Sequence, residues 1–122
     1  MPVRAIRGAV QVDSNDREAI LDGADELVRE TLKRNAVEPA DVISMLFTAT
    51  PDLDAEFPAY AARRLGLTDV PLLCATEIAV RGAMPRVLRL LAHVETDRAR
   101  SDIRHVYLRG AVELRPDLAT LS

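Results

Sequence analysis

The segment PLLCATEIAVRGAMPRVLRLL, residues 71–91, places three polar or ionisable side chains within otherwise apolar sequence: Cys74, Glu77 and Arg89. A carboxylate or a guanidinium is costly to bury unless it is paired, so Glu77 and Arg89 each need a partner. That partner is either another part of the protein or a ligand. The segment is therefore where the search for a functional site begins.

Two elements are expected within this segment, a strand followed by a helix. Residues 70–77 (VPLLCATE) form a short apolar run typical of a strand. Gly82 and Pro85 predict the start of a helix that continues to about Glu95. The polar side chains would then lie on the strand and on the helix that follows it.

Arg89 has two interpretations on the predicted helix. With Arg86 and His93 it forms a polar stripe at helical spacing, and such a stripe is most often a solvated face. Because Arg89 lies between Leu88 and Leu90, it can also border the buried side and project into a cleft. Spacing alone favours the solvated face.

Cys74 and Glu77 have opposite parity in an ideal strand, so they face one pocket only if the chain twists or bends between them. A lone cysteine is usually a small core residue, and a carboxylate at a strand end commonly pairs with a helix. A structural interpretation of both residues therefore stands beside the ligand hypothesis.

Outside this segment, the pattern predicts alternating strands and helices. Residues 3–12 form a strand interrupted by Gly8, and Asn15 caps a helix that runs from Asp16 to about Arg34. The apolar run at residues 42–49 is typical of a central strand covered on both faces. The other expected elements are a helical turn opened by Pro39, a loop at 50–58, a short helix from Pro58 to Leu65 ending at Gly66, and one strand or two over 103–114 with a bend at Gly110. The order β-α-β-α-β-α-β predicts an α/β or α+β layered protein, with residues 1–122 forming one domain.

Composition limits the classes of function. The chain has 122 residues, 48% of them hydrophobic, and a net charge of −3, which argues against a nucleic-acid or anionic-membrane surface. No apolar run approaches the roughly 20 residues of a membrane span. A single cysteine allows no intramolecular disulfide, and the start MPVRAIRGAV lacks the apolar run of a signal peptide, so a cytoplasmic protein is expected.

Several familiar chemistries lack their residues. Two isolated histidines and one cysteine predict no metal site, and there is no Gly-rich phosphate loop or G-x-S-x-G elbow. Nothing in the sequence supports Cys74 as a nucleophile activated by His105. Arg7 and Tyr107, taken alone, are explained by a surface pairing and by packing. An arginine-rich pocket without an obvious acid, base or nucleophile remains.

Four segments of the sequence together resemble the monofunctional chorismate mutases of the AroH class: AIRGA (5–9), TATPDLDAEFPAYAAR (48–63), VPLLCATEIAVRG (70–82) and IRHVYLRGAVELRPDL (103–118). The resemblance implies an isomerase that converts chorismate to prephenate in phenylalanine and tyrosine biosynthesis, without a cofactor. It also implies an α+β fold in which a mixed sheet packs with helices. Three subunits would form a homotrimeric pseudo-α/β barrel, with a site at each interface.

Residue by residue, the resemblance implies catalytic roles for Arg7, Glu77 and Arg89. The substrate-binding residues that it implies are Cys74, Tyr107, Phe57, Ala59, Arg63, Leu73 and Leu114. Tyr60 and Leu73 depart from the family, which often has lysine and threonine there, and this changes the expected entrance electrostatics and one minor contact. The tail after Leu118 is short, so any closing role of the tail is expected to be reduced.

The implied reaction is a concerted intramolecular Claisen rearrangement, which needs no nucleophile and no proton transfer. The protein then holds a reactive shape and stabilises developing charge. The resemblance implies that Arg89 donates to the ether oxygen, that Arg7 and Tyr107 bind carboxylate, and that Glu77 and Cys74 contact the ring hydroxyl. Two alternatives stay open. One is a non-catalytic or differently catalytic trimer of similar shape, such as the YjgF-like proteins, and the other is a regulatory domain that binds an aromatic-pathway metabolite without turnover.

Overall fold

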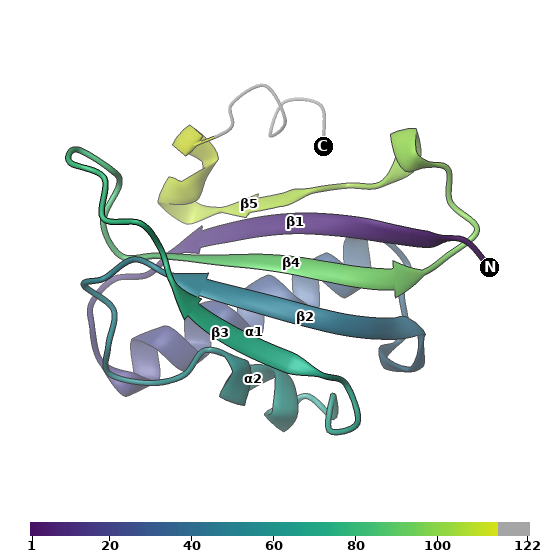
Figure 1. The fold of residues 1–122 in the computed structure, drawn as a ribbon, viewed down its shortest axis with the longest axis horizontal. Helices are drawn as coiled ribbons and strands as arrows, with labels where there is room; N and C mark the ends of the chain where they lie inside the picture. Colours follow the sequence, from purple (N-terminus) through teal and green to yellow (C-terminus); the bar gives the residue numbers. More distant parts are fainter. Residues whose placement is uncertain (115–122) are drawn as a thin grey trace.

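The computed structural model describes residues 1–114, which form one mixed sheet with two α-helices packed on one of its faces (Figure 1). The elements are β1 (Val3–Gln11), α1 (Arg17–Arg34), η1 (Pro39–Asp41), β2 (Val42–Ala49), α2 (Ala59–Arg64), β3 (Leu72–Thr76), β4 (Val87–Glu95), η2 (Arg100–Asp102), β5 (Val106–Leu108) and η3 (Arg109–Leu114). The strand order is β3-β2-β4-β1-β5. β4 runs antiparallel to β1 and β2, whereas β1–β5 and β2–β3 are parallel pairs. The predicted α+β fold with a mixed sheet is confirmed.

The main core lies between the sheet and α1, because the apolar stripe of that helix faces β1. Gly8 allows this close approach on β1. A Cβ built at Gly8 would lie 2.9 Å from Leu27 Cδ1 and 3.0 Å from the carbonyl oxygen of Val106. The absence of a side chain at position 8 therefore allows β1 to pack closely against both α1 and β5.

The helix α1 begins one residue later than predicted. Asp16 is the N-cap, and its carboxylate accepts a hydrogen bond from the backbone N–H of Ala19 at 2.9 Å. The prediction that Asn15 caps the helix was therefore wrong. The side chain of Asn15 instead contacts the loop that precedes α2, where its Oδ1 accepts from the N–H groups of Asp54 and Ala55.

The predicted helix from Gly82 to about Glu95 is also wrong, because residues 87–95 form the strand β4 in the middle of the sheet. Leucine favours helices, but the buried positions here alternate along the chain with period two. These positions are Leu88, Leu90, Ala92 and Val94, each at most 2% exposed. Pairing with a strand on each side outweighs local helix propensity. Arg89 and His93 consequently project from a strand rather than from a helix.

The strand β2 has the predicted bounds and lies inside the sheet, between β3 and β4. It is not the middle strand, and the helices cover only one of its faces. Met45 and Phe47 are buried on the helix side, whereas Leu46 and Thr48 between them are only partly buried. Within one chain, β2 is fully buried only on the side that faces the helices. The expectation that both faces of β2 are covered is therefore not met.

At the end of the described chain, the strand predicted over residues 103–114 is replaced in its second half by a 3₁₀ helix. β5 ends at Leu108, because Arg109 takes a φ of 54° and turns the chain into η3. The predicted bend at Gly110 therefore falls one residue earlier. The expectation about the tail after Leu118 lies outside the described residues.

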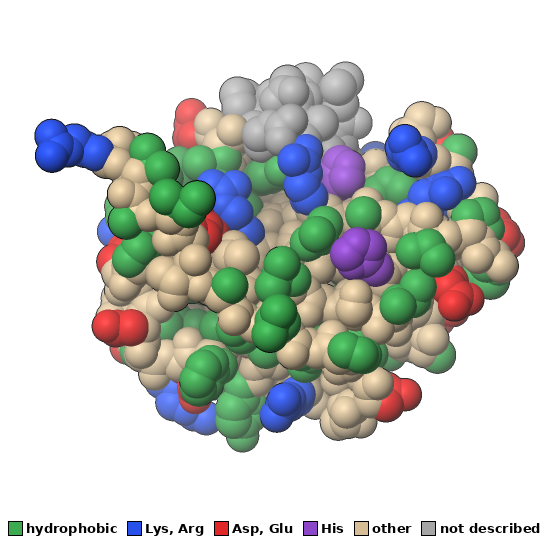
Figure 2. Space-filling view, in the orientation of Figure 1, with side chains coloured by type: hydrophobic (Ala, Val, Ile, Leu, Met, Phe, Trp, Pro, Cys, Tyr) green, Lys and Arg blue, Asp and Glu red, His purple; other side chains and the backbone are tan. Residues whose placement is uncertain are grey.

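The sheet face opposite the helices, which we call the open face, is covered by no α-helix within residues 1–114; only η3 packs against it, over Ala9 and Tyr107 (Figures 1 and 2). Strand alternation and register place these side chains on the open face: Ala5, Arg7 and Ala9 of β1; Ser44, Leu46 and Thr48 of β2; Leu73 and Ala75 of β3; Arg89, Leu91 and His93 of β4; and Tyr107 of β5. Much of this surface is apolar (Figure 2). Arg7 and Arg89 place two positive charges on this face.

Candidate active site

The centre of the site is a three-residue network on the open face that joins Arg89, Glu77 and Thr48. Arg89 Nε lies 3.2 Å from Glu77 Oε1 and 3.1 Å from Glu77 Oε2, and the hydroxyl of Thr48 donates to Glu77 Oε2 at 2.7 Å. The Glu77 side chain is 17% exposed and that of Arg89 is 43% exposed. Among residues 1–114, Glu77 engages Arg89 through Nε, so the two terminal nitrogens of Arg89 are left to meet a ligand.

The local fold explains why these residues meet. Thr48 of β2 and Arg89 of β4 are directly opposite in register, and Ala75 of β3 is opposite Thr48 on the other side. Glu77 follows two residues after Ala75, and its backbone N–H bonds the carbonyl of Ala49 at 2.9 Å. The carboxylate therefore returns over β2 and reaches the arginine of β4.

Arg7 and Tyr107 border the same part of the open face. Together with Thr48 and Arg89 they line a cavity of about 220 Å³. Ala9 is the register partner of both Arg89 and Tyr107, and it is fully buried against Tyr107. We call Arg7, Thr48, Glu77, Arg89 and Tyr107 the arginine cluster.

Within the arginine cluster, Arg7 and Tyr107 differ in exposure. Arg7 is exposed and forms no ion pair within residues 1–114. Its backbone N–H donates to Nδ1 of His105 at 3.0 Å, which fixes the strand at this residue. Tyr107 is only 8% exposed and packs against Ala9, as expected for an aromatic ring with a polar edge. The free guanidinium is the part that can follow a ligand.

All the other predicted binding residues except Leu114 line a second cavity, of about 800 Å³, at the β3 edge of the sheet. Its lining is Phe57, Ala59, Tyr60, Arg63, Arg64, Leu72, Leu73 and Cys74, and we call it the α2 pocket. The chain enters α2 through Pro58, whose fixed φ suits a helix start, and leaves it at Gly66, which has a φ of 96°. This short helix presents Arg63 and Tyr60 to the cavity.

The loop that leads into α2 is held by a charged contact. The Glu56 carboxylate accepts from the backbone N–H of Phe57 at 2.9 Å and from Arg17 Nε at 2.9 Å. The hydrogen bond from Phe57 is the largest influence and lowers the pKa of Glu56; burial opposes this, and Arg17 adds to the lowering. Glu56 is therefore ionised at neutral pH.

Cys74 and Glu77 do not share a pocket within one chain. Cys74 is the register partner of the buried Phe47 on the helix side, whereas Glu77 reaches Thr48 on the open face. The expected bend between Cys74 and Glu77 is not found, since β3 keeps its alternation to Thr76. Cys74 lines the α2 pocket, and Glu77 belongs to the arginine cluster.

The structure thus divides the predicted site residues between two places. The cluster contains Arg7, Glu77, Arg89 and Tyr107; the α2 pocket contains Phe57, Ala59, Arg63, Leu73 and Cys74; and Leu114 packs beside Tyr107. Thr48 was not among the predicted site residues. Only its hydroxyl, in an otherwise apolar strand, could have suggested a role, and its partner depends on the register of β2 with β4.

The arginine cluster can bind and polarise an anionic ligand. Two guanidinium groups and a phenol are donors, and Glu77 is the one carboxylate of the cluster. Within residues 1–114, no group of three or more His, Cys, Asp or Glu side chains could hold a metal ion. No helix in that range is long and apolar enough to cross a membrane.

Fold and site together define a class of small α+β proteins, with an arginine-rich site on the face of a five-stranded mixed sheet that the helices leave open. The chain belongs to the chorismate mutase type I family, whose model matches residues 3–118.

Similar proteins carry the same description. The chain is 47% identical to "Chorismate mutase AroH" of Thermus thermophilus over 117 residues, covering 95% of this chain and 96% of that protein. It is 43% identical to "Chorismate mutase AroH" of Bacillus subtilis (strain 168) over 120 residues, covering 98% and 94%. A solved structure of a chorismate mutase from Clostridium thermocellum superposes with a TM-score of 0.87 at 46% identity, covering 88% of this chain and 96% of the other.

Proposed function

We propose that this protein is a chorismate mutase that converts chorismate to prephenate by an intramolecular Claisen rearrangement. The observation that carries the proposal is the arginine cluster on the open face of a chain that belongs to this family. Arg89 is preorganised by Glu77 and Thr48, with its terminal nitrogens available. A rearrangement of this kind needs such a charged donor and no nucleophile.

In the reaction, the ether C–O bond of chorismate breaks while a C–C bond forms within the same molecule. Electrons move in a closed ring, so no proton and no second reactant is required. Negative charge develops on the ether oxygen, and Arg89 donates to that oxygen in the transition state. This interaction is stronger in the transition state than in the ground state, which is the condition for raising kcat.

The remaining residues bind and orient the substrate. Arg7 and Tyr107 bind a substrate carboxylate, and Glu77 accepts from the ring hydroxyl while it holds Arg89. In the assembly proposed below, the α2 pocket of one subunit meets the arginine cluster of another. Cys74 then lies near the same ring hydroxyl of the substrate. Phe57, Ala59, Arg63, Leu73 and Leu114 surround the substrate and restrict it to a reactive conformation.

The proposal includes a homotrimer in which the subunits form a pseudo-α/β barrel and each site lies between two of them. Two features support this assembly. The open face carries apolar side chains that nothing within residues 1–114 covers, such as Leu73 at 65% exposure. The predicted site residues lie in two separate cavities of one chain, so a neighbouring subunit can bring the α2 pocket of one copy to the arginine cluster of the next.

We also propose that the protein acts in the cytoplasm, within phenylalanine and tyrosine biosynthesis. Its single cysteine leaves no intramolecular disulfide that would depend on an oxidising compartment.

The direct test mixes the purified protein with chorismate and follows the loss of chorismate's ultraviolet absorbance, with prephenate identified as the product. The proposal expects turnover without added metal or cofactor. Binding of chorismate without turnover would support the regulatory alternative. Neither binding nor turnover would leave a trimer with a different ligand as the better account.

A further inference from the structure

The residues that precede and open α1 contact the loop before the α2 pocket, although they do not line that pocket. Asn15 Nδ2 donates to Asp54 Oδ1 at 2.8 Å, and Asn15 Oδ1 accepts from the N–H groups of Asp54 and Ala55 at 3.0 and 3.1 Å. One amide side chain therefore makes three hydrogen bonds to two residues of this loop. A helix cap would not need any of them.

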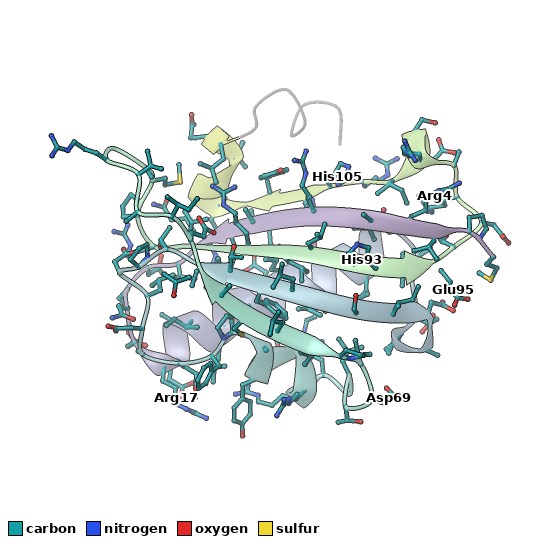
Figure 3. The ribbon with its side chains drawn as sticks, viewed as in Figure 1. Arg4, Arg17, Asp69, His93, Glu95 and His105 are labelled. Atoms are coloured by element: carbon teal, nitrogen blue, oxygen red, sulfur yellow. The ribbon has the colours of Figure 1, made fainter. Side chains whose placement is uncertain are left out.

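Arg17 makes the second set of contacts, two residues along. Its Nε donates to Glu56 at 2.9 Å, and its guanidinium carbon lies 5.5 Å from the centre of the Tyr60 ring. A cation at this distance from a tyrosine face is attracted to the ring. Figure 3 labels Arg17 at the end of α1 that lies beside α2. Arg17 thus connects α1 to Glu56, which precedes Phe57, and to Tyr60, which follows Phe57 in the chain.

These contacts reach the two aromatic residues of the α2 pocket, and both of these residues are exposed. Phe57 is 70% exposed and Tyr60 is 44% exposed. The Phe57 backbone N–H is fixed by Glu56, which Arg17 in turn fixes, and the Phe57 carbonyl accepts from Tyr60 N–H at 3.1 Å. A chain of contacts runs from Arg17 through Glu56 and Phe57 to Tyr60.

We propose that Asn15 and Arg17 are positioning residues that hold Phe57 and Tyr60 in the arrangement required to bind substrate. This inference rests on the proposed function, since it takes the α2 pocket as part of the chorismate site. Neither residue touches the reacting atoms. Their loss should widen the range of conformations of the pocket wall, which weakens substrate binding and leaves the charge stabilisation by Arg89 intact.

The test uses Asn15→Ala and Arg17→Gln in the full chain. Arg29→Gln is the matched control, because Arg29 forms an ion pair with Asp25 on the same helix, away from the pocket. Each of the first two variants is expected to raise KM for chorismate about five- to tenfold, with kcat within about twofold of the wild type. Arg17→Lys, which keeps the charge but not the fork of donors, should recover part of the loss. The control should change neither constant.

A second readout does not depend on activity. The chain has only two tyrosines, two phenylalanines and no tryptophan, so the ring signals of Phe57 and Tyr60 can be resolved by NMR. Arg17→Gln should shift the Tyr60 ring signals and leave those of Tyr107 in place. Unchanged Tyr60 signals, or an unchanged KM in both variants, would overturn the inference.

The two proposals fail in different ways. If the wild-type protein does not turn over chorismate, the proposed function fails, and the NMR comparison still decides whether Arg17 positions Tyr60. If the wild type is active and the variants only unfold at lower temperature with kcat and KM unchanged, the two residues are structural and the inference is wrong.

Discussion

Arg89 shows how one side chain combines a structural and a functional role. Its ion pair with Glu77 satisfies the need for a partner that the sequence indicated, yet it uses only Nε. An arginine held by one edge keeps its orientation without losing its other donors. The structural explanation and the ligand explanation are therefore compatible at this residue.

Replacing Arg89 by alanine should remove that oriented donor while leaving the fold intact. We expect Arg89→Ala to fold and assemble but to lose at least about a hundredfold in kcat, the usual effect of removing a preorganised donor. Circular dichroism, light scattering and the chorismate assay measure the three properties. Arg29→Ala serves as an exposed arginine control, and wild-type turnover by Arg89→Ala would refute the role of this residue.

At the residue scale, the sequence predicted which side chains form the site better than it predicted which residues they contact. Arg7, Glu77, Arg89 and Tyr107 were selected through motifs, and the structure brings them to one part of the open face. Thr48 was missed because a threonine in an apolar strand has no spacing signal. Its bond to Glu77 depends on strand pairing, which is a property of the folded sheet.

At the element scale, the main error concerned β4, and its cause is physical. The segment contains leucines that favour a helix, and only the alternation of buried positions indicates a strand. Elements with one strong local signal were predicted well, such as β2 from its apolar run and α2 from Pro58 and Gly66. In β4 the local signal favours a helix, so its strand structure depends on pairing with β1 and β2 and could not be read from the segment alone.

Gly8 provides a test of packing between elements. Its missing side chain allows α1 and β5 to approach β1, and one of the two nearest atoms is a backbone oxygen that cannot move aside easily. Gly8→Ala should therefore lower the free energy of unfolding by about 1–3 kcal/mol. Denaturant unfolding measures the change, with the exposed Ala40→Ser as the control. A variant as stable as the wild type would show that the elements are less tightly packed than described.

At the scale of the whole molecule, three carboxylates link stability to pH. Hydrogen bonds from Ser14 and from the N–H of Ala19 lower the pKa of Asp16. Burial raises the pKa of Asp52, but hydrogen bonds from Thr50 and from the N–H of Arg86 outweigh burial and lower it. The pKa of Glu56 is lowered as described above.

A carboxylate with a lowered pKa in the folded state stabilises the protein above its unfolded pKa, and this contribution is lost as the pH falls through the folded pKa. The ordinary pKa values are 3.8 for an Asp side chain and 4.5 for a Glu side chain. The melting temperature should therefore stay level from pH 7 to about pH 5 and fall below about pH 4. Asp16→Ala should reduce the size of that fall, and a melting temperature that rises on acidification would contradict the assignment.

The separation of the arginine cluster from the α2 pocket is the feature on which the whole account depends. Each copy contains both parts, yet we propose that a working site takes one part from each of two copies. Arg89→Ala inactivates the first part. Arg63→Glu places a negative charge in the second part, where it repels an anionic substrate, and Arg63 is exposed, so the fold should tolerate the change.

The most direct measurement is the chorismate mutase activity of mixed assemblies made by co-expressing Arg89→Ala and Arg63→Glu chains. Each variant alone should be nearly inactive. Random mixing of equal amounts should restore both intact parts in about one quarter of the sites, and hence about one quarter of wild-type activity. Mixed assemblies as inactive as the separate variants would contradict a site shared between copies.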